Sequence, residues 1–162
     1  GAILVDAGLK TNLDGVFAAG DCAAVTWYDG QKRPEQLWYT GRDQGRLAGR
    51  RLCGEKAEYQ RGLFYNSAKL MDIEYTTAGL VNWRLDGEKS WFFEEHGRVR
   101  STTRVVVQND RVVGFNMLGR RWEQSVLIRW IEEHRTLNWV IGHLNDAAFD
   151  TELDPPLRIS GA

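Results

Sequence analysis

The segment from Thr11 to Cys22 constrains this chain more than any other stretch of its sequence. The dipeptide Asp14-Gly15 predicts a turn, and the apolar residues Val16–Ala19 after it predict a short buried strand. Gly20-Asp21 follows at once. A glycine lets a ligand approach the backbone closely, and a carboxylate accepts hydrogen bonds from sugar-like hydroxyls. The pattern therefore fits either the edge of a ligand site or an ordinary strand followed by a tight turn.

A glycine-rich helix is predicted from Gln36 to Leu52, with Gly54 as its C-terminal cap. Gly41, Gly45 and Gly49 recur every four residues within it, and positions four apart share one face of a helix. Each glycine costs a helix about 1 kcal/mol relative to alanine. Another backbone or a cofactor is therefore expected to approach that face closely, and the sequence leaves both alternatives open.

Charge and composition argue against several classes of partner. The chain has 162 residues, 27% of them charged, and a formal net charge of −1. No electrostatic attraction to nucleic acid or anionic membranes is therefore expected. No apolar run reaches the roughly 18 residues of a membrane span, and no signal peptide is recognised. Cys22 and Cys53 lack metal-ligand or redox spacing, so we expect reduced, buried thiols in a cytoplasmic protein.

Tryptophan is unusually frequent, and histidine carries no recognisable site. The tryptophans are expected to anchor the core or a subunit interface, because no basic groove that would bind nucleic acid accompanies them. They are Trp27, Trp38, Trp83, Trp91, Trp122, Trp130 and Trp139. The three histidines lack the spacing of a metal site, so no metal is predicted. His134 lies near a predicted helix end, where the helix dipole explains it.

The second half of the chain changes to a strand-rich pattern. Strands are predicted over residues 69–81, 90–95, 100–108 and 111–118, with a hairpin turn at Asn109-Asp110. An apolar stripe from Trp122 to Ile131 predicts a helix, and Thr136 is the expected N-cap of a second one. The tail, with Pro155-Pro156, should be irregular. An antiparallel sheet with helices at one end is an α+β fold.

These motifs resemble those of a known family. The pattern Thr-x-x-x-Gly-Val-Phe-Ala-x-Gly-Asp over residues 11–21 is similar to the second flavin-binding motif of the FAD-dependent pyridine nucleotide–disulfide oxidoreductases. Residues 1–10 resemble the strand that leads into this motif. Gln36, Trp38 and residues 44–48 are similar to a pattern of the NADH oxidase-like and ferredoxin reductase-like branches. Residues 63–150 resemble the interface domain through which these enzymes dimerise.

The resemblance implies a flavin site in this chain but no catalytic residue. Asp21 would bind the ribityl chain of FAD, and Gly20 would permit its approach. The start of the helix, at Gln36, Leu37 and Trp38, would point its amides at the pyrimidine edge of the flavin. That placement would stabilise negative charge on the reduced flavin and so tune its redox potential.

The resemblance also implies that the chain is the C-terminal part of a longer enzyme. The Gly-x-Gly-x-x-Gly fingerprints through which the family binds FAD and NAD(P)H do not occur in this sequence. Residues 1–53 would be the remnant of an FAD-binding α/β domain, 54–62 a linker, 63–150 the dimerisation domain and 151–162 an irregular tail. The parent would be a cytoplasmic homodimer that binds NAD(P)H outside this chain, and the isolated chain would be inactive.

The alternative is a standalone, non-catalytic dimerisation module of the same fold. Two features argue against it. A pure interface module has no reason to place Gly20-Asp21 after a strand, and the predicted strand Ile3–Val5 needs parallel neighbours that this chain is not expected to supply.

Overall fold

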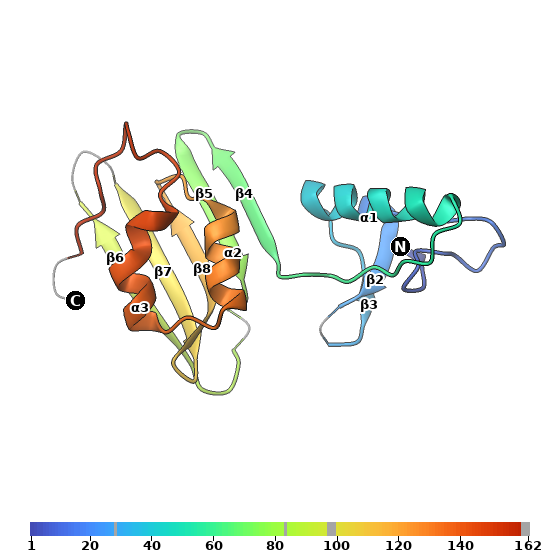
Figure 1. The fold of residues 1–162 in the computed structure, drawn as a ribbon, viewed down its shortest axis with the longest axis horizontal. Helices are drawn as coiled ribbons and strands as arrows, with labels where there is room; N and C mark the ends of the chain where they lie inside the picture. Colours follow the sequence, from blue (N-terminus) through green and yellow to red (C-terminus); the bar gives the residue numbers. More distant parts are fainter. Residues whose placement is uncertain (28, 83, 97–99, 160–162) are drawn as a thin grey trace. The chain divides into compact units, whose positions relative to one another are not determined.

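The structure divides into two compact units, which are described separately. It is a computed structural model, and it describes residues 1–27, 29–82, 84–96 and 100–159 (Figure 1). Unit 1 comprises Gly1–Gly62, and unit 2 comprises Leu63–Ala162. Within the described residues, no helix combines the length and the apolar character needed to cross a bilayer.

Unit 1 is built on a small mixed sheet of three short strands in the order β1-β2-β3. β1 (Ile3–Leu4) pairs in parallel with β2 (Ala23–Thr26), and β2 pairs in antiparallel orientation with β3 (Lys32–Arg33). One parallel neighbour of the first strand therefore lies within this chain. The expectation that the chain supplies none is wrong, because the strand after Asp21 was not recognised in the sequence.

The predicted strand Val16–Ala19 does not form. That segment makes only one isolated bridge, between Lys10 and Phe17, and Val16 is exposed. The apolar residues that pair in the sheet are instead those of β2, whose first three residues are buried. A single 3-10 turn, η1 (Gly20–Cys22), separates the two segments. Asp21 therefore precedes the buried strand rather than following it.

The glycine-rich helix is present as α1 (Trp38–Leu52). It begins two residues later than predicted, because Leu37 keeps an extended backbone with φ −132° and ψ 137°. Gly54 follows the end of the helix with a left-handed φ of 88°, which confirms it as the terminating glycine. Leu47 points from α1 into the core of unit 1, which is formed by Val5, Leu9, Ala18, Ala23, Val25 and Leu47.

The charged segment 54–62 lies against unit 1. The backbone N–H of Tyr59 donates a hydrogen bond to the carbonyl oxygen of Ala7 at 2.6 Å. Ala57 and Tyr59 pack against the core, and Arg61 forms a buried ion pair with Glu35. The division between the two compact units falls after Gly62, so this segment makes its contacts with the unit that precedes it.

Unit 2 contains a five-stranded antiparallel sheet in the order β4-β5-β8-β7-β6 (Figure 1). Its strands are β4 (Tyr65–Leu70), β5 (Ile73–Gly79), β6 (Glu88–Glu95), β7 (Ser101–Gln108) and β8 (Arg111–Leu118). The strand predicted over residues 69–81 is interrupted by a turn at Met71-Asp72. The turn predicted at Asn109-Asp110 is confirmed, since both residues have positive φ, 50° and 62°, as two-residue hairpin turns require.

Two helices cover one face of this sheet (Figure 1). They are α2 (Gln124–Glu132) and α3 (Leu137–His143), and a 3-10 turn, η2 (Leu144–Ala147), follows α3. Thr136 caps α3 as predicted, because its side-chain oxygen accepts a hydrogen bond from the backbone N–H of Trp139 at 3.4 Å. The antiparallel sheet with its helices is the predicted α+β fold.

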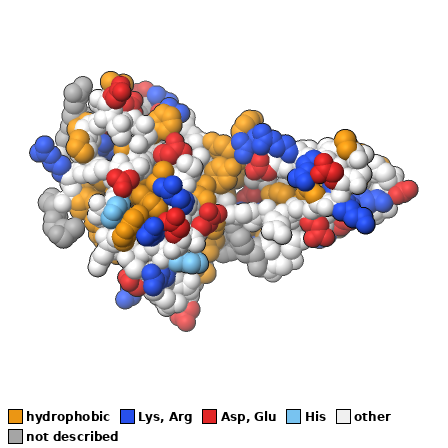
Figure 2. All heavy atoms as spheres, viewed as in Figure 1, with side chains coloured by type: hydrophobic (Ala, Val, Ile, Leu, Met, Phe, Trp, Pro, Cys, Tyr) orange, Lys and Arg blue, Asp and Glu red, His pale blue; other side chains and the backbone are white. Residues whose placement is uncertain are grey.

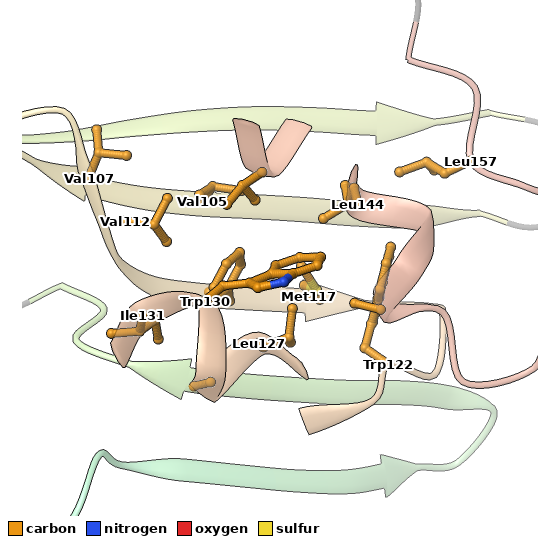
Figure 3. Packing of buried hydrophobic residues seen from close by; sticks show 14 residues of the cluster. Val105, Val107, Val112, Met117, Trp122, Leu127, Trp130, Ile131, Leu144 and Leu157 are labelled. Atoms are coloured by element: carbon orange, nitrogen blue, oxygen red, sulfur yellow. The ribbon is translucent and has the colours of Figure 1, made fainter. Parts of the chain in front are cut away.

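The core of unit 2 lies between the sheet and the helices. Figure 3 shows the indole of Trp130 near the centre of this core. Its ring centroid lies 6.2 Å from that of Phe115 and 5.7 Å from that of Trp139. The buried side chains are Ala78, Val105, Val107, Val112, Phe115, Met117, Trp122, Leu127, Trp130, Ile131, Val140, Leu144, Ala147 and Leu157.

Most of the tryptophans pack against the two cores. Trp122 and Trp130 are buried in the core of unit 2, Trp91 and Trp139 pack against that core, and Trp27 packs against the core of unit 1. Trp38 differs, because 71% of it is exposed at the start of α1. Trp83 lies outside the described residues.

Two glycines let β5 and β8 approach neighbouring backbone. A Cβ atom on Gly79 would lie 2.2 Å from the carbonyl oxygen of Val113, and one on Gly114 would lie 2.1 Å from that of Leu80. Both distances are far shorter than non-bonded contact. Because Gly79 and Gly114 also face each other in the strand register, any larger side chain at either position must move backbone.

We expect Gly114→Ala to destabilise unit 2 by at least about 2 kcal/mol, because the added methyl group collides with a backbone that cannot yield. Gly142→Ala is the matched control, since its added Cβ meets no described atom within 4 Å in α3 and alanine favours helix by up to about 1 kcal/mol. Equilibrium urea unfolding measures both. A Gly114→Ala variant as stable as the parent chain would contradict the packing of Gly114 against Leu80.

Candidate functional site

Gly20 holds η1 against the first turns of α1. Its backbone N–H donates a hydrogen bond to the Oε1 atom of Gln44 at 2.8 Å. A Cβ atom added at Gly20 would lie 3.7 Å from the Cα atom of Gly41, an ordinary van der Waals distance, so the two backbones run close together there. Gly20 has a left-handed φ of 79°, a conformation that glycine adopts without steric cost. The structure thus brings the predicted Gly20-Asp21 pair next to the predicted helix.

Asp21 presents its carboxylate at the surface of η1. The residue is exposed, and within the described part of the chain its side chain has no hydrogen-bond or ion-pair partner. A carboxylate in this state can accept hydrogen bonds from an incoming ligand without first breaking internal ones.

The start of α1 is open for a ligand. Leu37 at the N-cap makes no side-chain hydrogen bond to the helix, and no acidic residue occupies the first turn. The first N–H groups of a helix have no partners within the helix and carry partial positive charge. Gln36 and Trp38 are exposed beside them, and Leu37 is half-buried. This end of α1 suits a carbonyl or anionic group of a ligand.

The glycine face of α1 meets another backbone only at its first glycine. Gly41 approaches Gly20, whereas a Cβ atom at Gly45 or Gly49 would meet no described atom within 4 Å. Both of these glycines are exposed. Packing on the sheet of unit 1 therefore does not account for the glycine spacing along the whole helix.

One acidic and one basic residue form a buried ion pair behind the start of α1. Neither was predicted as a site residue from the sequence. The Glu35 carboxylate accepts a hydrogen bond from the Thr40 hydroxyl at 2.9 Å and pairs with the Arg61 guanidinium. The two charged side chains are only 5% and 7% exposed. Arg61 also stacks over the ring of Trp27, with 4.2 Å between the guanidinium carbon and the ring centroid. No local pattern links Glu35 to Arg61, because 26 positions separate them.

Gln44 was also missed, although its position carries a signal. It is fully buried and lies one turn before Leu47 on the buried face of α1. A polar residue on a buried helical face needs a hydrogen-bonding partner, and Gly20 supplies it. Burial raises the pKa of the nearby Tyr59 hydroxyl above its ordinary value, and a hydrogen bond with Gln44 opposes that effect. Tyr59 is therefore neutral at physiological pH.

The cysteines and histidines do not form a reactive cluster. Cys22 and Cys53 are free, but both are exposed, so the predicted burial is wrong. Both residues flank helical turns at the surface, Cys22 at the end of η1 and Cys53 at the C-terminus of α1. His134 is exposed after α2, with a positive φ of 53°. Among the described residues, no group of three or more potential metal ligands occurs.

A hollow of about 690 Å³ lies within unit 2. It is open at the ends of β6, β7 and β8 and holds none of the predicted site residues. Its lining residues are Asp72, Ile73, Glu94, Glu95, His96, Arg100, Ser101, Thr102, Leu118, Gly119 and Asp154. Arg120 binds Glu95 through two hydrogen bonds of 2.7 and 2.8 Å, and these bonds hold the pKa of Glu95 below its usual value.

Charges of both signs are mixed over the face of the molecule shown in Figure 2, and neither forms a broad field there. This distribution agrees with the net charge of −1. A nucleic-acid site usually needs a basic stripe or patch, which this face does not present.

The sequence and the fold of this chain are similar to those of known oxidoreductases. No family model matches the chain. Two curated relatives, both named pyridine nucleotide-disulfide oxidoreductase domain-containing protein 1, come from Dictyostelium discoideum and Drosophila melanogaster. They are 24% identical over 148 residues and 29% identical over 126 residues. In each case the match covers 74% of this chain and 27% of the relative, so the chain spans about a quarter of the length of these proteins.

Solved structures show the same fold. A NAD-dependent persulfide reductase from A. fulgidus matches with a TM-score of 0.70 and 20% identity, over 87% of this chain and 29% of its own. An FAD-dependent pyridine nucleotide-disulphide oxidoreductase from Desulfovibrio vulgaris matches with a TM-score of 0.63 and 22% identity, over 91% and 38%. The resemblance to pyridine nucleotide–disulfide oxidoreductases is thereby confirmed, and the matches are consistent with a C-terminal part of such an enzyme.

We expect Gly20→Ala to destabilise unit 1 by about 1 to 2 kcal/mol, because an L-residue is strained at a left-handed φ. Gly45→Ala in α1 is the control, since its Cβ has open space and should add up to about 1 kcal/mol of stability. Thermal unfolding of the two variants provides the comparison. Equal melting temperatures would show that Gly20 does not need its left-handed conformation.

Proposed function

We propose that this chain is the C-terminal part of an FAD-dependent NAD(P)H oxidoreductase, in which it supplies part of the FAD pocket and the dimer interface. The observation that carries the proposal is the hydrogen bond from the backbone N–H of Gly20 in η1 to Gln44 in α1, beside the close approach of Gly20 to Gly41. It brings an unpartnered carboxylate, Asp21, to an uncapped helix start in a fold shared with oxidoreductases. Residues 1–53 are assigned to the FAD-binding domain and residues 63–150 to the interface domain, with 54–62 as their connection.

The residues at this place fit a flavin nucleotide. Gly20 has no side chain to keep a ligand from the backbone, and the Asp21 carboxylate is free to accept hydrogen bonds from the ribityl hydroxyls. Gln36, Leu37 and Trp38 surround the first amides of α1, which carry partial positive charge. These amides suit the carbonyl edge of the flavin ring and favour negative charge on it. The exposed glycines 45 and 49 leave room beside the helix for further contacts.

These residues bind the flavin, and the redox chemistry belongs to the flavin itself. When bound, FAD supplies the redox chemistry, taking electrons from NAD(P)H and passing them to an acceptor. This chain binds and orients the flavin and sets the potential around it. No residue of the chain is assigned a catalytic role, and NAD(P)H is expected to bind elsewhere in the parent protein. Two free thiols, Cys22 and Cys53, support a reducing, cytoplasmic location.

In the intact protein, Asp21→Ala should weaken FAD binding by about tenfold to a hundredfold, because it removes a charged hydrogen-bond acceptor. Asp14→Asn is the matched control. Asp14 is another surface carboxylate of unit 1, and it pairs only with Lys10 at 2.8 Å. Flavin fluorescence during titration measures the dissociation constant. Unchanged affinity in Asp21→Ala would contradict the assignment, and a colourless parent protein that takes up no FAD would favour a non-catalytic dimerisation module.

We also propose that unit 2 mediates homodimerisation. Large apolar side chains are exposed in the sheet and in the turn between β4 and β5, among them Phe92 at 55% and Met71 at 93%. On β6, Trp91 and Phe93 pack against the core, so Phe92, between them, points to the other face of the sheet. Exposed aromatic residues are typical anchors of protein interfaces.

Sedimentation of the 162-residue chain should reveal a dimer, and Phe92→Asp should weaken it by about tenfold or more, because a charge would be buried without a partner. Leu153→Asp, which changes a 78% exposed residue in the tail, should leave association unchanged. A strict monomer at high concentration would overturn the dimer proposal without affecting the FAD site.

A further inference from the structure

The Glu35–Arg61 pair lies at the start of α1, where Glu35 contacts the N-cap residue and the first turn of the helix. The backbone N–H of Leu37 donates to the carbonyl oxygen of Glu35 at 3.0 Å, and the Glu35 carboxylate accepts the Thr40 hydroxyl from the first turn of the helix. Arg61 approaches the same carboxylate from the segment that follows α1. A single residue, Glu35, therefore joins the N-cap, the first turn of the helix and the segment that follows α1.

The pair also decides the charge near the helix start. Glu35 lies two residues before the N-cap Leu37, close enough for its charge to add to the field of the helix end. Alone, the carboxylate would offset the positive potential of the first amides. With Arg61 bound, the two charges cancel to first order. Because both side chains are almost fully buried, solvent screens them weakly.

We propose that Glu35 and Arg61 are a positioning pair that fixes the start of α1 and keeps its positive potential available to the bound flavin. This inference rests on the proposed function. Neither residue is required to touch the flavin. The pair acts through the geometry of residues 36–40 and through the balance of its two charges.

The charge balance predicts effects of opposite sign. Arg61→Gln leaves the Glu35 carboxylate uncompensated, which disfavours negative charge on the reduced flavin and shifts its midpoint potential to more negative values. Glu35→Gln leaves the guanidinium uncompensated and shifts the potential to more positive values. The double variant Glu35→Gln/Arg61→Gln removes both charges and should return close to the parent potential. A role limited to packing would move both single variants in the same direction.

The potential is measured by spectroscopic redox titration of the intact flavoprotein. Arg61→Lys, which keeps the charge, should stay nearer to the parent value than Arg61→Gln, and it preserves the test if a single neutral variant does not fold. The control pair is Arg50–Glu55, which has a similar contact of 2.7 Å but is more than half exposed. Arg50→Gln and Glu55→Gln should leave the potential unchanged. Shifts of the same sign in Arg61→Gln and Glu35→Gln, or equal shifts in the control pair, overturn the proposal.

A second readout needs no flavin. In the 162-residue chain, Arg61→Gln should accelerate hydrogen exchange of the Gly41 amide, which donates to the carbonyl oxygen of Leu37 at 2.9 Å, by about tenfold, because the helix start loses its anchor, while Arg50→Gln should not. Unchanged exchange in Arg61→Gln overturns the positioning role even if FAD binds. A parent protein that binds no FAD overturns the proposed function and the claim on potential, whereas accelerated exchange would still support the positioning role.

Discussion

The close approach of Gly20 to α1, at Gly41 and Gln44, is the constraint on which the candidate site depends. Gly20 has a left-handed backbone that other residues reach only with strain, and its N–H is bound by the buried amide of Gln44. Any side chain on Gly20 would strain its backbone, and larger ones on Gly41 would press the two backbones apart. The position of Asp21 relative to α1 follows from this close approach and from the Gly20–Gln44 hydrogen bond, since the Asp21 carboxylate has no partner of its own within the described residues.

Apart from Asp21, the side-chain charges described near the start of α1 are paired. Glu35 is buried in an ion pair with Arg61, burial raises the pKa of the Tyr59 hydroxyl, and no acidic residue occupies the first turn of α1. The groups left to act on a ligand are the Asp21 carboxylate and the partial positive charge of the helix amides. Such a pair can accept hydrogen bonds from hydroxyls and donate them to carbonyl oxygens within one site.

The sequence predicted the elements better than their boundaries. The α+β fold, the Asn109-Asp110 turn and the Thr136 cap were predicted correctly, because each depends on local chemistry that a short window contains. The strand at Val16–Ala19 was not, since pairing with β1 is decided by which apolar run can be buried, and that run is β2.

For the candidate site too, the residue types could be predicted from short stretches of sequence, but the contacts between distant residues could not. The Gly20-Asp21 pair and the helix start could be marked from the sequence as candidates, because glycine, a carboxylate and a helix beginning have recognisable patterns. That they lie together depends on Gln44 reaching Gly20, and the Glu35–Arg61 pair joins residues with no common pattern. The exposure of Cys22 and Cys53 likewise depends on where helical turns end in space.

The strand order of unit 2 has a consequence for the path by which it folds. Two groups of strands are consecutive both along the chain and in the sheet: β4 with β5, and β6 with β7 and β8. Each group can therefore form its hydrogen bonds between residues that are close in sequence. The pairing of β5 with β8 instead joins Gly79 to Gly114 across the whole of β6 and β7. Closing that long loop costs chain entropy before any burial compensates it. We therefore expect the docking of the β4–β5 hairpin onto β8 to be the late event, with both glycines needed before α2 can complete the core.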